Sequence, residues 1–311
     1  MIRPYKGSID SKLVFHIGFH KTGTSYLQNL FFPMHPEIQL ISNSVSPWDD
    51  PFLQYLIKTD DNNFDPVQLK MLLRNQIEKF HERDPSVYIV SAERLSGHPA
   101  SGGYDRQRIA YRIHECFPES RIICVVRNQT DMIYSLWRQM LVEGYCGKLN
   151  SFLKQSHWKT IGFGLNYLEY DHLICTYYKL FGEKRVCVLC YELMKKDLLK
   201  FLDTICDFLN LEYRGVAAES IIYKSIPIWG APILRFINHF RKTELNPFPI
   251  FNIGTNIPKG CIYILKKLNF GVGKMDKKLQ DLIREYYQSS NLRLLSMVDR
   301  DLTLFKRKVQ P

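Results

Sequence analysis

The sequence predicts an α/β fold with a parallel central sheet. Four short apolar runs, near residues 13–17, 87–90, 121–126 and 185–191, have the length and β-branched content of buried strands. The segments between them carry apolar residues at helical spacing, and strands that alternate with helices favour parallel pairing through right-handed crossovers. Polar residues follow these strands directly, at the edge where such sheets bind their ligands.

Composition supports one domain of enzyme size. The chain has 311 residues, of which 45% are hydrophobic and 13% aromatic, so it can bury one large core. We expect a single domain over residues 1–311, in which the weakly patterned segments near 34–85, 141–165 and 211–262 form loops and lids. The formal net charge of +11 suits a polyanionic ligand. Nucleic acid would be attracted as well, but no nucleic-acid motif accompanies the charge, so we expect no such partner.

Neither a metal site nor a membrane span is expected. The eight cysteines are scattered through the expected strands and helices, as is typical of a reduced core. Cys187 and Cys190 have a zinc-like interval but lie inside a strand pattern without a second pair, and the nine histidines are not spaced as ligands. No run approaches the apolar length of a membrane span, and we expect a cytoplasmic protein.

The first strand ends in the turn 16–25, HIGFHKTGTS, which has the composition of an anion-binding loop. Gly18 and Gly23 let the backbone approach a ligand closely, and Lys21 supplies positive charge. The residues that add hydroxyl donors are Thr22, Thr24 and Ser25. A helix is expected to follow, and its first backbone N–H groups attract an anion. The alternative is an ordinary strand-to-helix turn capped by Thr24 or Ser25. A Walker loop is disfavoured because the lysine precedes the second glycine.

The next two strands also end in polar residues. Strand 87–90 delivers Ser91 and Glu93 to the same edge of the sheet. Arg127 follows strand 121–126, and Asn128 or Thr130 caps a helix that contains Ser135. An arginine fork with a hydroxyl suits phosphate recognition. The alternatives are a surface ion pair for Arg127, a solvated helix serine for Ser135, and a helix-start carboxylate or a partner of Arg94 for Glu93.

These motifs resemble those of sulfotransferases that use 3′-phosphoadenosine 5′-phosphosulfate (PAPS) as donor. Residues 21–25 match their 5′-phosphosulfate loop, P-K-[ST]-G-T-[TS], with His20 in place of the proline. Four residues match the 3′-phosphate motif R-[ND]-P-x-D-x-x-x-S: Arg127, Asn128, Asp131 and Ser135. Gln129 replaces the proline of that motif.

The resemblance implies a P-loop-like three-layer α/β/α sandwich and further contacts to the donor. Tyr191, in a segment similar to the family's Y-E-D element, would border the adenine, and Tyr26 would stack on it. Core packing is the alternative for both rings. Lys259, with Gly260, would correspond to a late K-G element that reaches the 3′-phosphate. Residues 281–305 resemble the closing segment of bacterial members.

The resemblance also implies in-line sulfuryl transfer without a metal. Lys21 and the loop amides would neutralise charge on the leaving phosphate. Glu93 falls at the position of the family's catalytic base, and a glutamate serves well there if burial raises its pKa. His20, beside Lys21, is the competing base because its ordinary pKa is closer to neutral.

The acceptor is expected to be a small molecule or a glycan, preferably a carbohydrate hydroxyl or amine, held by the weakly patterned segments. Two other functions remain open. An ATP-dependent kinase or NTPase would use the first loop with ATP and magnesium, and a noncatalytic glycan-binding protein could have kept the fold without the reaction.

Overall fold

The computed structural model describes residues 9–43, 49–80, 85–154, 162–212, 230–251, 275–298 and 302–309. Within these ranges the centre is a five-stranded, all-parallel sheet with the order β2-β3-β1-β4-β5. The strands are β1 (Leu13–His16), β2 (Ile38–Asn43), β3 (Val87–Ser91), β4 (Arg121–Val126) and β5 (Val186–Cys190). The α/β fold that the sequence predicts is therefore confirmed.

The first strand of the chain lies in the middle of the sheet. β1 pairs with β3 on one side, where His16 is opposite Ser91, and with β4 on the other, where Phe15 is opposite Ile122. Every residue of β1, β3 and β5 is buried, as expected for a parallel sheet covered on both faces. The carboxyl ends of β1, β3, β4 and β5 consequently meet at one edge.

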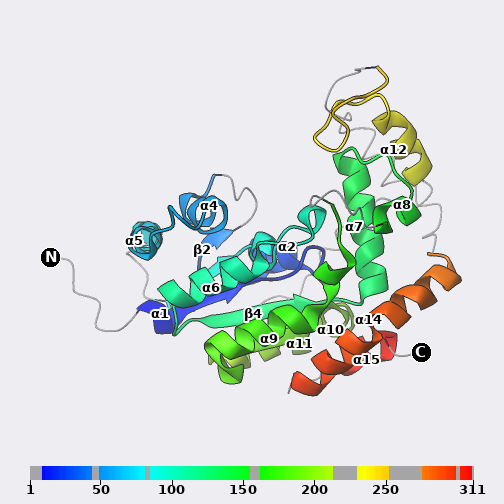
Figure 1. Cartoon of the computed structure of the whole chain (residues 1–311). Helices are drawn as coiled ribbons and strands as arrows, with labels where there is room; N and C mark the ends of the chain where they lie inside the picture. The colour runs from blue at the N-terminus through cyan, green and yellow to red at the C-terminus, as the bar shows by residue number, and fades with distance from the viewer. Residues whose placement is uncertain are drawn as a thin grey trace.

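Helices and helical turns connect the strands (Figure 1). The α-helices are α1 (Ile9–Lys12), α2 (Thr24–Tyr26), α3 (Phe32–Met34), α4 (Pro51–Lys58), α5 (Pro66–Ile77), α6 (Arg106–Cys116), α7 (Gln129–Glu143), α8 (Leu149–Leu153), α9 (Tyr170–Phe181), α10 (Tyr191–Lys196), α11 (Leu198–Leu209), α12 (Gly230–Asn238), α14 (Lys277–Met297) and α15 (Thr303–Val309). A π-helical segment, η1 (Leu27–Phe31), joins α2 to α3. The 3₁₀ turns are η2 (Glu78–Phe80), η3 (Glu93–Ser96), η4 (Pro99–Ser101), η5 (Leu165–Leu168) and η6 (Glu183–Arg185).

The helices form two layers around the sheet. Right-handed crossovers that run in opposite directions along a sheet put their helices on opposite faces. The crossover from β1 to β2 runs opposite to the later ones, so α3 lies on the face away from α4, α5, α6 and α9. The helices α4, α5, α6 and α9 contact one another in that order. On the other face, Cys206 of α11 contacts His35, which follows α3, so α11 lies on the same side as α3. This is the three-layer arrangement that the family resemblance implies.

The structure departs from the sequence prediction most in the segment 34–85. Residues 38–43 form the edge strand β2, and α4 and α5 follow it, so this segment supplies part of the scaffold. The two helices have strong local start signals, because Asp50 and Asp65 cap them and a proline follows each cap. The run of β2, IQLISN, is half polar, so it lacks the continuous apolar pattern that predicts the other four strands.

The remaining weakly patterned segments contain helices as well. α8 falls within 141–165, and α12 falls within 211–262. α12 packs against the end of α7 that lies farthest from the sheet (Figure 1). None of the described helices is both long and apolar enough to cross a lipid bilayer.

Candidate active site

The turn after β1 has the backbone conformation of an anion-binding loop. Lys21 and Gly23 both adopt left-handed conformations, with φ of 66° and 91°. Thr22 stabilises the turn from within, because its buried Oγ1 donates a 2.6 Å hydrogen bond to the carbonyl of Phe19. Gly23 is the N-cap of α2, so Thr24 and Ser25 lie inside the helix, and the alternative of an ordinary turn capped by one of them is wrong.

Gly23 is required for space as well as for conformation. A Cβ at this position would lie 2.4 Å from Sδ of Met194 and 3.4 Å from Cε2 of Tyr191. The turn after β1 therefore packs directly against α10, at the carboxyl end of β5. This contact closes one side of the site.

His20 and Glu93 form an ion pair across the neighbouring strands β1 and β3. His20 Nδ1 lies 2.9 Å from Glu93 Oε2, and the two side chains are 12% and 24% exposed. With Nδ1–H donating to the carboxylate, His20 Nε2 is buried and has no hydrogen-bond partner among the residues that the structure describes. Arg94, the alternative partner of Glu93, pairs with the buried Asp105 instead.

A lone glutamate serves well as the base if burial raises its pKa, but the pKa of Glu93 is lowered overall. Burial raises the pKa of its carboxyl, but the hydrogen bond from His20 and the charges of His20 and Lys21 outweigh that effect and lower the pKa overall. The carboxylate is therefore ionised near neutral pH and acts electrostatically on His20. The two competing bases of the sequence analysis are one hydrogen-bonded unit.

Arg127 lies at the end of β4, beside the turn after β1. Its Nη1 donates a 2.8 Å hydrogen bond to the carbonyl of Lys21, and its guanidinium carbon lies 4.8 Å from the ring centroid of Tyr191. Arg127 Nε is buried and has no partner among the described residues. β1 and β4 continue in opposite directions along the sheet, so these residues lie at its topological switch point.

The helix that follows Arg127, α7, is capped by one of the two residues predicted for that role, Asn128 or Thr130. Asn128 is the cap, since its side chain accepts from the backbone N–H of Asp131 at 3.2 Å. Ser135 lies two turns into α7 and is only 2% exposed, and no polar contact joins it to Arg127 within the described part of the chain.

The remaining predicted site residues differ in their placement. Tyr191 is partly exposed and contacts Arg127, whereas Tyr26 is 4% exposed with a buried hydroxyl, so its ring is part of the core. Burial raises the pKa of Tyr26 accordingly. Ser91 is fully buried and forms a 2.7 Å hydrogen bond with His16 Nδ1. The expectation that Ser91 faces the ligand crevice is therefore wrong. Lys259 lies outside the described residues.

Several supporting residues escaped the sequence analysis. Glu192 Oε1 accepts from the backbone N–H of Asn128 at 3.0 Å, which ties α10 to the start of α7. Gln129, at the proline position of the family motif, exchanges hydrogen bonds of 2.6 and 3.2 Å with the buried amide of Asn291. The replacement of the motif's proline by Gln129 was a signal that this position has a separate role. Its partner, Asn291, lies 162 residues away and could not be identified from one sequence.

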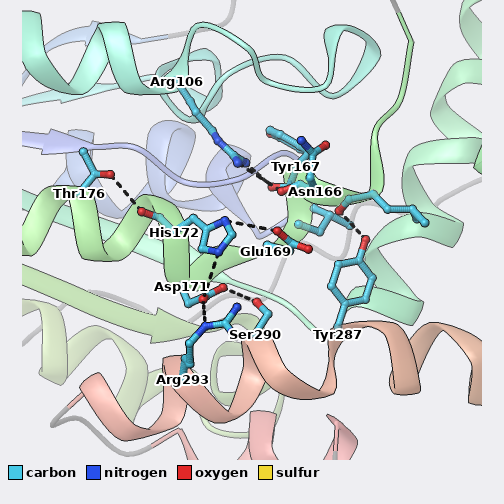
Figure 2. A network of polar contacts seen from close by, with 12 residues as sticks. Arg106, Asn166, Tyr167, Glu169, Asp171, His172, Thr176, Tyr287, Ser290 and Arg293 are labelled. Carbon is cyan, nitrogen blue, oxygen red and sulfur yellow. Dashed lines mark hydrogen bonds and ion pairs between the residues drawn. The ribbon is translucent and has the colours of Figure 1, made fainter. Parts of the chain in front are cut away.

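A buried polar network holds α14 against α9 behind the site. Asp171 accepts hydrogen bonds from Ser290 and, at 2.6 Å, from Arg293 Nε (Figure 2). Tyr287 donates at 2.7 Å to the carbonyl of Leu165 on the segment that enters α9. These bonds fix the helix that carries Asn291.

The donor set fits a bisphosphorylated nucleotide. Lys21 and Arg127 supply positive charge, and His20 Nε2 and Arg127 Nε are buried donors or acceptors that a polar ligand could satisfy. Within the described ranges, no group of three or more histidine, cysteine, aspartate or glutamate side chains is arranged to hold a metal ion.

Comparisons with known proteins give a family match over part of the chain and a similar fold. Residues 110–226 match the family model for the sulfotransferase domain. No curated protein matches the sequence significantly. A sulfotransferase from Alicyclobacillus acidocaldarius is similar in structure, with 15% identity, a TM-score of 0.56 and coverage of 94% of this chain and 98% of that one. A mouse sulfotransferase complexed with PAP is also 15% identical, with a TM-score of 0.44 and coverage of 96% and 90%. The first of these two structures supports the fold alone.

Proposed function

We propose that this chain is a sulfotransferase, as the match of residues 110–226 to the sulfotransferase domain model supports, and that it transfers the sulfuryl group of PAPS to a hydroxyl or amine of a carbohydrate. One observation carries the proposal: Lys21 and Arg127, from the ends of adjacent strands, are joined by a 2.8 Å hydrogen bond. Two anion-binding elements held this close suit a ligand with phosphates at both ends of one nucleoside.

Each end of the donor has its own residues in this proposal. The turn of residues 21–25 and the start of α2 bind the 5′ side, where Lys21 neutralises the charge that develops on the leaving phosphate. Arg127 and Ser135 bind the 3′-phosphate, and Tyr191 borders the adenine. Lys259 remains a further candidate for the 3′-phosphate.

The His20–Glu93 pair takes the proton of the acceptor. PAPS supplies an activated sulfuryl group, and transfer forms a bond from the acceptor oxygen to sulfur while the bond from sulfur to the 5′-phosphate oxygen breaks. His20 Nε2 is free to accept the acceptor proton, because Nδ1 is engaged by Glu93 at 2.9 Å. Glu93 stabilises the imidazolium that results, and adenosine 3′,5′-bisphosphate (PAP) leaves.

Polar residues at the end of α7 favour a carbohydrate acceptor. Gln139 Nε2 donates at 2.8 Å to Glu143 Oε1. Partial burial raises the pKa of Glu143, and the charges of His20 and Lys21 oppose that rise, so this pair lies within electrostatic reach of the base. An amide and a carboxylate side by side offer the donors and acceptors that sugar hydroxyls require.

A hydrophobic alcohol is the second candidate acceptor. The segment around α12, which packs on the end of α7, exposes large apolar side chains: Phe236, Phe248, Ile250 and Phe251. Exposed apolar residues beside a site often contact an apolar ligand.

Calorimetric titration tests the donor. We expect tighter binding of PAP than of ATP with magnesium, and we expect Arg127→Ala to abolish that preference. Preference for ATP would support a kinase or NTPase and contradict the proposal.

Transfer of labelled sulfate tests the reaction and its acceptor. Glycans and hydrophobic alcohols are offered with PAPS to the wild-type chain and to Gln139→Ala, and we expect label on a glycan and less of it with the variant. Binding of PAP without transfer to either class would favour a noncatalytic protein that kept the fold.

A further inference from the structure

Tyr170 connects the two anion-binding elements from behind. It is the first residue of α9 and is fully buried. Its hydroxyl donates a 2.8 Å hydrogen bond to the backbone carbonyl of Arg127, and its ring lies edge-on to Phe19, with centroids 4.6 Å apart. Phe19 belongs to the turn after β1, two residues before Lys21.

Arg127 completes a closed ring of contacts. Its Nη1 donates to the carbonyl of Lys21 at 2.8 Å, so the contacts run from Tyr170 to Arg127, to Lys21, along the turn to Phe19, and back to Tyr170. Lys21 has a φ of 66°, a conformation that is unfavourable for a residue with a Cβ and persists only where neighbouring contacts hold it. The hydrogen bond from Arg127 is such a contact.

The position of Arg127 therefore affects both ends of the donor site. One of its five N–H groups is used on Lys21, and Nε has no partner within the described part of the chain, so a donor remains for an anion. A shift of its backbone would move the 3′-phosphate donors and release the Lys21 carbonyl together. The Tyr170 hydroxyl is the side-chain donor that holds that backbone carbonyl.

We propose that Tyr170 is a positioning residue that acts through Arg127 to couple the 3′-phosphate and 5′-phosphosulfate ends of the donor site. This inference rests on the proposed function. A purely structural role is the competing explanation, because Tyr170 also packs against Phe305, with ring centroids 6.4 Å apart.

A double-mutant cycle separates the two explanations. PAP and adenosine 5′-monophosphate are titrated into the wild type, Tyr170→Phe, Arg127→Ala and the double variant, with thermal unfolding recorded for each. We expect Tyr170→Phe to raise the Kd for PAP about fivefold, the size of one lost hydrogen bond, and to lower the preference for PAP over the monophosphate. In the Arg127→Ala background, Tyr170→Phe should change the Kd for PAP less than twofold, since the residue through which it acts is gone.

Tyr177→Phe is the matched control. Tyr177 lies on the same helix, is fully buried, and its hydroxyl has no partner among the described residues. Its substitution should leave both Kd values unchanged. If Arg127→Ala does not fold, Arg127→Lys serves in the cycle, because an ammonium cannot reproduce the planar fork of the arginine.

The outcomes distinguish the inference from the function on which it rests. An equal effect of Tyr170→Phe with and without Arg127, or no effect at all, would overturn the positioning role while leaving the donor assignment intact. A wild-type chain that does not prefer PAP to the monophosphate would overturn the proposed function itself.

Discussion

The hydrogen bond between His20 and Glu93 assigns different tasks to two side chains that the sequence presents as rivals. A carboxylate with a lowered pKa is a weak base, but it keeps an imidazole in one tautomer and stabilises its charged form. Neither residue could be given its task from the sequence, because the pair joins positions 73 residues apart on strands whose adjacency depends on the fold.

Glu93→Gln tests this division of labour. The amide can still accept the hydrogen bond from His20 Nδ1 but carries no charge, so we expect kcat to fall roughly 10²-fold. His20→Asn should cost at least as much, and the double variant little more than the worse single one, because the residues act as a unit. Strictly additive losses in steady-state kinetics would contradict the pairing.

A second titrating residue at this scale is His16, beneath the turn after β1. Complete burial lowers its pKa from 6.5 to about 4, so its neutral form is favoured in the folded state. The unfolded chain binds the extra proton first, so stability is complete above pH 6.5 and falls as the pH drops towards 4. The shift corresponds to about 3 kcal/mol over that window.

Urea unfolding between pH 7 and pH 4 measures the contribution of His16. His16→Asn is expected to lower stability at pH 7 and to flatten the fall with acidity. His239→Asn, at an exposed position, is the control and should keep the wild-type slope. An unchanged slope in His16→Asn would show that other groups govern the acid sensitivity.

At the scale of elements, the turn between β1 and α2 depends on a glycine for two separate reasons. Gly23 has a φ of 91°, and a Cβ there would meet Met194 Sδ at 2.4 Å. We expect Gly23→Ala to destabilise the fold by about 1–3 kcal/mol and to weaken PAP binding. Adding Met194→Ala removes the steric conflict but not the backbone strain, so thermal unfolding and calorimetry should show partial recovery. Complete recovery would mean that the conformation of Gly23 is unimportant.

The start of α7 shows how this chain departs from the family motif and compensates. Gln129 occupies the first position of the helix, where a proline is well tolerated, and its side chain satisfies the buried Asn291 of α14. Gln129→Pro would leave that amide unsatisfied, at a cost of about 1–3 kcal/mol in chemical denaturation. Asn291→Leu in the same variant should recover part of the loss, whereas alone it should destabilise.

Local signals explain which elements the sequence predicts. Apolar strands such as 121–126 and the turn of residues 16–25 are recognisable within ten residues, and all four predicted strands are present. Tyr26 and Tyr191 look alike in the sequence, yet one ring lies in the core and the other beside Arg127, because the packing of distant helices decides exposure. The roles of Tyr170 and Glu192 depend on the same long-range packing.

At the scale of the whole molecule, the donor site joins elements from distant parts of the chain. A ligand that bridges Lys21 and Arg127 binds only the assembled sheet, so it should stabilise the fold as a unit. PAP at one hundred times its Kd is expected to add about 2.7 kcal/mol of stability. Thermal unfolding of wild type and Arg127→Ala at the same PAP concentration checks this, and an equal shift in both would contradict the bridging site.

The central place of β1 has a consequence for synthesis. The strand and its lysine are made early, but the arginine that holds the lysine carbonyl follows 106 residues later, and β1 waits for neighbours on both sides. A nascent chain thus carries only one half of the binding site while the 106 residues from the lysine to the arginine are translated. Nucleotide affinity is acquired late, so a nucleotide added to refolding protein captures the finished molecule and cannot guide its earliest steps.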